Sequence, residues 1–356
     1  MIHKISLTIF ILTFGATVFA QSGRVKPSET PTPKREMPRP NAVYMPTQTI
    51  VPKPAATSAA TPKIEDDDII KVDSALVPIP VSVLDAGGQT VDNLKLADFT
   101  LLIDGQAAEI GELSRSETPV RLAVLFDNSS SVTIAREFEK KAAVRFFKRV
   151  LRPSKDLAAL FSVSTGTRLE QPLTKDISQI IQAIETFPAP QGATALLDGI
   201  IKAAEYLREA DGRRVIVIVS DGEDTISDST FEDVLKAVQA ANVQVYVVKT
   251  KDFENYKQTG QRIGNANIRA LAAERRMQDI TAQTGGAVYS PIDDRELDRA
   301  FDQISAELAQ QYVLSYYPES EAQKPGEFRT ISLSVKTGRN LTVRTRKGYY
   351  VPKIVR

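Results

Sequence analysis

The chain has 356 residues, of which 42% are hydrophobic, and its 45 Lys and Arg nearly balance its 44 Asp and Glu, for a formal net charge of +1. The length and apolar content predict two domains with a sizeable core, and the balanced charge argues against a nucleic-acid binder, which needs a basic surface. Cysteine is absent, which excludes disulfide scaffolds, cysteine-ligated zinc, iron–sulfur clusters and thiol nucleophiles.

The first 20 residues have the pattern of a secretory signal peptide. Lys4 gives a positive start, residues 5–14 form an apolar run, and Ala20 places a small side chain before an expected cut at Gln21. The apolar run is shorter than the ~20 residues that a membrane span needs; an uncleaved anchor is the alternative. We therefore expect residues 1–20 to be removed, no transmembrane segment to remain, and the protein to be secreted or to lie in the periplasm or cell envelope.

Removal of this segment would also remove His3, the single histidine of the chain. A mature chain without His and Cys excludes Ser-His-Asp triads, histidine general bases and histidine-ligated metals. The chemistry that remains open uses carboxylates, hydroxyls, Lys, Tyr or a metal held by oxygen atoms.

Residues 21–63 are rich in proline. They hold nine of the 20 prolines, with seven basic residues and two acidic ones. Such a segment cannot bury enough apolar surface to offset its ordering entropy, so we expect a disordered, Pro-rich linker. Contact of this basic tail with a polyanion is the alternative interpretation.

Short strands are expected on both sides of a central segment. Before it, in residues 64–119, apolar runs at 76–85 and 99–105 end in the turn signals Gly87-Gly88 and Asp104-Gly105. After it, in residues 311–356, strands are expected at 312–317, 328–335 and 341–346. Each group alone is too small for a stable sheet sandwich. We therefore expect the two groups to form the N-terminal and C-terminal halves of one small β-sandwich.

The central segment, residues 120–310, alternates between strand and helix patterns. Continuous apolar strands are expected at 120–126, 157–163, 214–220, 243–248 and 287–289, and helices at 133–151, 177–184, 195–207, 231–240, 270–284 and 296–308. All-apolar strands alternating with helices predict an α/β fold with a mostly parallel sheet covered on both faces. Residues 250–269, polar and Gly-containing, are expected to be a connection that could shape a partner surface.

Polar side chains with oxygen atoms follow two of the predicted strands. The carboxyl ends of parallel strands meet at one edge of a sheet, which is where α/β proteins bind ligands. A further loop, which opens the helix at 195–207, supplies a threonine. Oxygen atoms suit a hard cation such as Mg²⁺, Mn²⁺ or Ca²⁺. In chain order, the candidate metal ligands are Asp127, Ser129, Ser131, Thr194 and Asp221.

This pattern resembles the metal-ion-dependent adhesion site of von Willebrand factor A domains. The motif Asp127-x-Ser129-x-Ser131, then Thr194, then Asp221 has the residues of that site in the same order, and the resemblance covers about residues 120–310. It implies a Rossmann-like von Willebrand A domain, inserted in or flanked by the small β-sandwich. It also implies that Ser129 and Ser131 ligate the metal directly, and the other three directly or through water.

The flanking segments resemble a bacterial subgroup, the secreted von Willebrand A-related proteins first named from Acidobacteria. The matching pieces are Asp98-Phe99 with Asp104-Gly105, Gln311-Tyr312-Val313-Leu314, and Arg344-Thr345-Arg346-Lys347-Gly348-Tyr349. This extends the resemblance to about residues 70–351 and identifies no particular partner.

We therefore expect a non-enzymatic, extracytoplasmic protein-binding or adhesion module whose bound cation, Mg²⁺ or else Mn²⁺ or Ca²⁺, meets an acidic side chain of a protein partner. One alternative is a metal-assisted phosphohydrolase with Asp127 as nucleophile, although such enzymes usually have a second Asp where this chain has Ser129. Another is a structural envelope protein stabilised by the cation. At residue level, Asp127 and Ser129 could instead cap the following helix, and Glu223 and Asp224 are expected to be solvated charges at the rim.

Overall fold

The computed structural model describes residues 76–115, 118–133, 136–261, 267–318, 324–337 and 340–351. The predicted signal peptide, 1–20, and Pro-rich linker, 21–63, lie outside these ranges. The chain divides into two units, 1–67 and 68–356, and all described elements belong to the second. The predicted boundaries at 64–119, 120–310 and 311–356 stay predictions.

A six-stranded sheet forms the α/β region of the chain. Its strand order is β10-β9-β8-β5-β6-β7. Every neighbouring pair is parallel except β6 and β7, which are antiparallel. This confirms the predicted α/β fold with a mostly parallel sheet. The strands are β5 (Val120–Asp127), β6 (Leu157–Val163), β7 (Thr167–Thr174), β8 (Arg213–Ser220), β9 (Val243–Lys249) and β10 (Val288–Tyr289).

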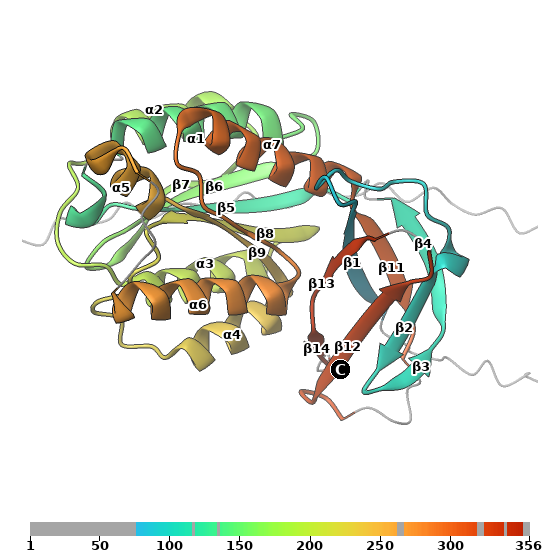
Figure 1. Cartoon of the computed structure of the whole chain (residues 1–356). Helices are drawn as coiled ribbons and strands as arrows, with labels where there is room; N and C mark the ends of the chain where they lie inside the picture. The colour runs from blue at the N-terminus through green and yellow to red at the C-terminus, as the bar shows by residue number, and fades with distance from the viewer. Residues whose placement is uncertain are drawn as a thin grey trace, which may run out of the picture. The chain divides into compact units, whose positions relative to one another are not determined.

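Helices cover both faces of this sheet (Figure 1). Strand β5 shows why: Val124 and Phe126 enter one hydrophobic core, and Ala123 and Leu125 enter the other. A strand buried on both faces has only its ends free to carry polar groups. One core is closed by α1 (Arg136–Val150), α2 (Ile177–Glu185) and α7 (Asp294–Gln310), and the other by α3 (Leu196–Arg208), α4 (Phe231–Ala240) and α6 (Ile268–Thr284).

The connection expected at 250–269 contains a helix that was not predicted. A further helix, α5 (Lys251–Thr259), begins directly after β9. Its Phe253 is 2% exposed and stacks on Phe138 of α1, with 3.6 Å between the ring centroids. This one aromatic anchor holds a helix whose other residues are mostly polar, so no apolar periodicity announces it.

The remaining strands form two four-stranded sheets, with orders β13-β1-β11-β4 and β14-β12-β2-β3. Each sheet combines strands that precede the α/β region with strands that follow it. Both sheets contribute to one core, which includes Ile79, Leu101, Tyr312 and Tyr349. The bounds are β1 (Val77–Leu84), β2 (Phe99–Ile103), β3 (Gln106–Ala108), β4 (Ile110–Arg115), β11 (Tyr312–Tyr316), β12 (Phe328–Val335), β13 (Thr342–Thr345) and β14 (Gly348–Tyr350), with 3₁₀ turns η1 (Leu96–Asp98) and η2 (Ser130–Val132).

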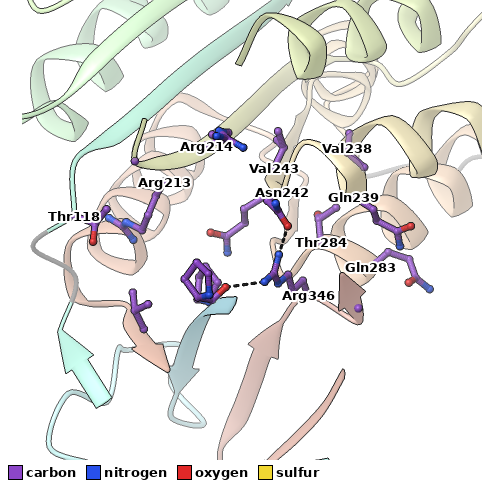
Figure 2. A pocket seen from close by; sticks show the side chains of 16 residues that line it. Thr118, Arg213, Arg214, Val238, Gln239, Asn242, Val243, Gln283, Thr284 and Arg346 are labelled. Carbon is purple, nitrogen blue, oxygen red and sulfur yellow. Dashed lines mark hydrogen bonds between the residues drawn. The ribbon is translucent and has the colours of Figure 1, made fainter. Parts of the chain in front are cut away.

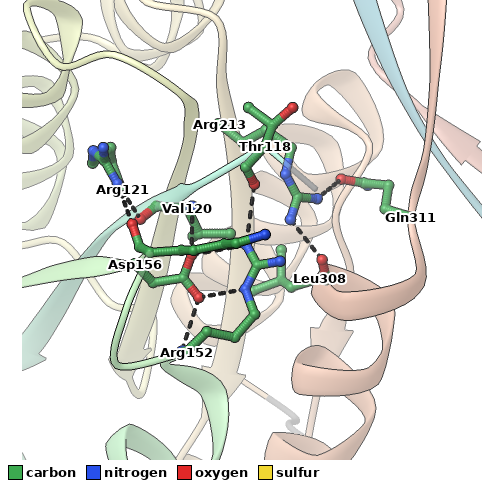
Figure 3. A network of polar contacts seen from close by, with 9 residues as sticks. Thr118, Val120, Arg121, Arg152, Asp156, Arg213, Leu308 and Gln311 are labelled. Atoms are coloured by element: carbon green, nitrogen blue, oxygen red, sulfur yellow. Dashed lines mark hydrogen bonds and ion pairs between the residues drawn. The ribbon is translucent and has the colours of Figure 1, made fainter. Parts of the chain in front are cut away.

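A buried polar network lies at the amino ends of β5 and β8 (Figure 3). The carboxylate of Asp156 accepts hydrogen bonds from the N–H of Val120 at 2.8 Å and from the guanidinium of Arg152 at 2.8 and 2.9 Å. Burial alone would raise the pKa of Asp156, but these hydrogen bonds hold it below its usual value. Arg213 donates to Gln311 at 2.7 Å and to the carbonyl of Leu308 at 2.6 Å.

Asp156→Ala is expected to lower the free energy of unfolding by about 3 kcal/mol, because it leaves a buried N–H and a partly buried guanidinium without their acceptor. The matched control is Asp302→Ala, since Asp302 pairs with Arg149 at 54% exposure and an exposed pair contributes less than about 1 kcal/mol. Urea unfolding of both variants tests this. Equal losses in the two variants would contradict it.

Within the ranges that the structure describes, none of the helices has the length and apolar composition needed to cross a bilayer.

Candidate metal centre

Asp127 lies at the carboxyl end of β5 and is 1% exposed. Its Oδ1 accepts a hydrogen bond from the N–H of Ser129 at 2.9 Å, and its Oδ2 accepts one from the hydroxyl of Ser220 at 2.7 Å. Ser220 is the last residue of β8, which pairs in parallel with β5. The carboxyl ends of β5 and β8 therefore lie next to each other, as predicted. Hydrogen bonds from residues at both strand ends hold the carboxylate of Asp127 in place.

Ser129 and Ser131 lie in the loop that follows β5. Their hydroxyl oxygens are 2.9 Å apart. Ser129 directly precedes η2, yet its side chain caps none of the N–H groups of that turn. The N–H of Ser130, between them, donates to the carbonyl of Gly192 at 3.1 Å, which connects this loop to the loop that carries Thr194.

Thr194 and Asp221 complete the predicted set, and both are 4% exposed. The N–H of Thr194 donates to the hydroxyl of Thr225 at 2.9 Å, and the N–H of Thr225 donates back to the carbonyl of Thr194 at 2.9 Å. Asp221 follows β8; its Oδ1 accepts from the N–H of Glu223 at 3.0 Å. Its Oδ2 is buried without a hydrogen-bond partner among the described residues.

Comparison with known proteins identifies the α/β region. The von Willebrand factor type A domain matches residues 122–285. These residues are a von Willebrand factor type A (VWA) domain. Such domains generally bind proteins, so the match indicates a protein-interaction module. The narrower resemblance to a secreted bacterial subgroup stays a prediction. A search of the curated proteins gives no match.

Solved structures with similar folds include three bacterial proteins. An aerotolerance-related membrane protein from Bacteroides fragilis is 17% identical, with 52% of this chain and 98% of that chain covered and a TM-score of 0.40. The pilus adhesin SpaC from Lactobacillus rhamnosus GG is 11% identical, with 72% and 48% covered and a TM-score of 0.43. A von Willebrand factor type A protein from Catenulispora acidiphila is 11% identical, with 80% and 76% covered and a TM-score of 0.43.

Negative charge accumulates at this edge of the VWA domain. Burial, and then the nearby charge of Asp221, raise the pKa of Asp127 to about 6, against the hydrogen bonds from Ser129 and Ser220. Arg136 interacts with Asp127 electrostatically but donates to the carbonyl of Pro188 at 2.8 Å. In the part of the chain that the structure describes, neither Asp127 nor Asp221 has an ion-pair partner.

Two glutamates beside the site were not predicted. Glu139 of α1 is 1% exposed, and Thr250 is its hydrogen-bonding neighbour. Burial, and then the charge of Asp127, raise its pKa. Glu254 of α5 is 4% exposed; burial first, then the charges of Asp221 and Asp127, raise its pKa to about 7, although Lys251 opposes this.

A signal for Glu139 was present in the sequence. Residues 142, 143 and 146 are apolar and lie three, four and seven positions after it, so Glu139 shares the buried stripe of its helix. Glu254 had no such signal, because its helix α5 was not predicted.

The residues of the predicted site fit a hard divalent cation. Two carboxylates and three hydroxyls supply only oxygen, which Mg²⁺, Mn²⁺ and Ca²⁺ prefer. The unpartnered Oδ2 of Asp221 is a buried acceptor that a cation would satisfy. No three carboxylates or imidazoles of the described residues gather as a metal-binding group. Coordination here would therefore depend on the hydroxyls of Ser129, Ser131 and Thr194.

Proposed function

We propose that the VWA domain binds a protein partner through a divalent cation, Mg²⁺ or else Mn²⁺ or Ca²⁺. Asp127, Ser129, Ser131, Thr194 and Asp221 would hold the cation directly or through water. When bound, it would offer an electrophilic coordination position to a carboxylate of the partner. The observation that carries the proposal is the unpartnered, buried Oδ2 of Asp221 beside the buried carboxylate of Asp127.

The surrounding charge supports dependence of partner binding on the cation. Glu223, and Glu254 when it is ionised, add negative potential around Asp127 and Asp221. Without a cation, this edge would repel an acidic partner, because like charges brought together at an interface cost several kcal/mol. With the cation, the same edge would attract a carboxylate. The site therefore supports an interaction that exists only in the metal-bound state.

Binding is favoured over catalysis by the residue at position 129. A phosphohydrolase that uses Asp127 as nucleophile would need an acid–base group two residues later. Ser129 occupies that position, and its hydroxyl lies 2.9 Å from that of Ser131. We propose that the protein is not an enzyme and that it acts outside the cytoplasm, in the envelope or secreted, as the pattern of residues 1–20 favours.

The decisive experiment is calorimetric titration of Mg²⁺, Mn²⁺ and Ca²⁺ into the purified protein, with and without acetate as a model carboxylate. We expect one-site binding that acetate strengthens, a loss of that binding in Asp221→Asn, and little change in Glu223→Gln. The two variants make the same acid-to-amide change two residues apart. Absence of binding with and without acetate, or equal binding by both variants, would contradict the proposal.

Turnover of a generic phosphate ester that requires Mg²⁺ and disappears in Asp127→Asn would establish the phosphohydrolase instead. If removal of the cation lowered the melting temperature without changing partner binding, the cation would be structural. Phosphate-ester turnover and the effect of the cation on melting temperature and partner binding therefore distinguish the binding module, the phosphohydrolase and the structural protein.

A further inference from the structure

A cavity lies at the end of the six-stranded sheet opposite the metal centre, where β8 begins. It has a volume of about 350 Å³ and is lined by residues of β1, the start of β8, α4 and the segment around Arg346 (Figure 2). Arg213 opens β8 and Ser220 closes it. At about 3.3 Å per residue, the cavity is about 23 Å from the metal centre, so the two sites share no residue.

The walls of this cavity combine apolar side chains with guanidinium groups. Pro78, Pro80, Val238, Val243 and Val313 supply apolar surface, and Arg213, Arg214 and Arg346 supply positive charge. No Asp or Glu is among the described residues that line it. Figure 2 shows Arg346 directed toward Asn242 on one side and Arg213 beside Thr118 on the other.

Arg346 is held by neutral acceptors. It donates to the side-chain carbonyl of Asn242, and its Nη2 donates to the backbone carbonyl of Pro78 at 2.7 Å. Its Nε is buried without a partner among the residues that the structure describes. Burial lowers its pKa to about 10. No carboxylate of the described residues pairs with this half-buried guanidinium.

Arg213 repeats this arrangement. It is 8% exposed, donates to Gln311 and to the carbonyl of Leu308, and keeps a buried Nε with no partner in the described ranges. Burial lowers its pKa to about 10. The nearby Asp156 is bound to Arg152. Arg214 interacts electrostatically with Asp211 and Glu209, and Arg213 does so with Asp156, so Arg346 is the lining guanidinium that no carboxylate compensates.

We propose that this cavity is a binding site for a small organic carboxylate. The carboxylate would accept hydrogen bonds from Arg346, whose planar donor group matches its two oxygens, while Arg213 adds positive charge to the wall. A short hydrocarbon part would cover Pro78, Val238 and Val313. The volume lies at the lower end of the range of about 300–1,000 Å³ for small-molecule sites, which limits the ligand to a few carbon atoms beyond its charged group.

The probe for this proposal is hexanoate, titrated calorimetrically into the full chain. Hexanamide has the same shape without the charge, and inorganic phosphate has charge without the apolar part. We expect hexanoate to bind at least about 10-fold more tightly than either. Equal affinity for phosphate and hexanoate would show that the apolar walls do not contribute to binding and would overturn the proposal of an organic ligand. Absence of hexanoate binding would overturn the proposal and leave a hydrated cavity.

Arg346→Gln is expected to weaken hexanoate binding at least about 10-fold, while Lys347→Gln leaves it unchanged. Lys347 is exposed and does not line this cavity, so the pair makes the same charge change one residue apart.

Gln239→Glu is the second variant, since it places a negative charge on a half-buried lining residue of α4 and keeps the contacts of Arg346. If Arg346→Gln does not fold, unchanged binding in Gln239→Glu overturns the proposal. Cation titration of the same variants is expected to be unchanged, so failure here is distinguishable from failure of the proposed function.

Discussion

Asp127→Asn is expected to abolish cation binding and, at the same time, to make the cation-free protein more stable. The carboxylate of Asp127 is 1% exposed, and burial together with the charge of Asp221 raises its pKa from 3.8 to about 6. A difference of about two pKa units corresponds to a cost of about 3 kcal/mol for holding this group ionised in the folded protein at pH 8. Asn removes the charge and keeps an acceptor for the N–H of Ser129.

The measurement is a pair of curves for each protein: urea unfolding at pH 8 in EDTA, and Mg²⁺ titration. Asp127→Asn is expected to gain about 2 kcal/mol of unfolding free energy and to lose at least about 100-fold in Mg²⁺ affinity, since even groups that only orient metal ligands contribute 10–100-fold. The control Asp302→Asn, on the exposed face of α7, is expected to change neither. If Asp127→Asn lost cooperative unfolding, the carboxylate would be a structural part of its loop.

This combination of effects distinguishes a binding site from a structural turn. A side chain retained for stability loses stability when it is neutralised. A side chain retained for a ligand can be unfavourable until the ligand arrives. The unpartnered Oδ2 of Asp221 has the same character, because it leaves a buried acceptor unsatisfied in the protein without ligand.

The parts of the fold that the sequence predicts well are those in which local pattern and tertiary environment agree. Strands β5 and β8 are continuous apolar runs because helices cover both faces of the sheet. Helix α4 matches the predicted 231–240, and a capping box between Thr230 and Asp233 fixes where it begins. Asp127, Ser129 and Asp221 follow from the positions where β5 and β8 end.

Two of the elements that were missed, β7 and α5, carry few apolar residues and depend on tertiary contacts. Strand β7 contains Pro172 and Glu170, and only an edge position tolerates such a composition. Helix α5 depends on Phe253 stacking against Phe138. Glu254 therefore reaches the site through a contact that no periodicity encodes. The cavity at Arg346 depends on β1 and α4 facing the same space, although the sequence places them about 160 residues apart.

The cation-free protein is also expected to lose stability as the pH rises from 5 to 8. Each carboxyl with a raised pKa binds its proton more tightly in the folded state than in the unfolded one. Its stabilising contribution is therefore complete below the unfolded pKa and is lost as the pH rises through the folded pKa. For Asp127 that value is about 6 and for Glu254 about 7, and Glu139 shifts in the same direction.

The expected loss is about 4 kcal/mol between pH 5 and pH 8 in EDTA. Mg²⁺ is expected to reverse it. Protons compete with the cation for the same oxygens at pH 5, whereas at pH 8 a saturating cation stabilises the folded state in proportion to the logarithm of its concentration. Stability without the cation should thus fall with pH, and stability with it should rise or stay level.

Urea unfolding at half-unit pH steps, with EDTA or Mg²⁺, tests this prediction. Glu254→Gln is expected to remove part of the slope in EDTA, whereas Glu232→Gln, an exposed residue in the first turn of α4, is expected to leave it intact. A slope that persists unchanged in Glu254→Gln, or stability that rises with pH in EDTA, would show that these carboxylates are already compensated in the cation-free protein. The negative edge could then not act as the barrier that makes partner binding depend on the cation.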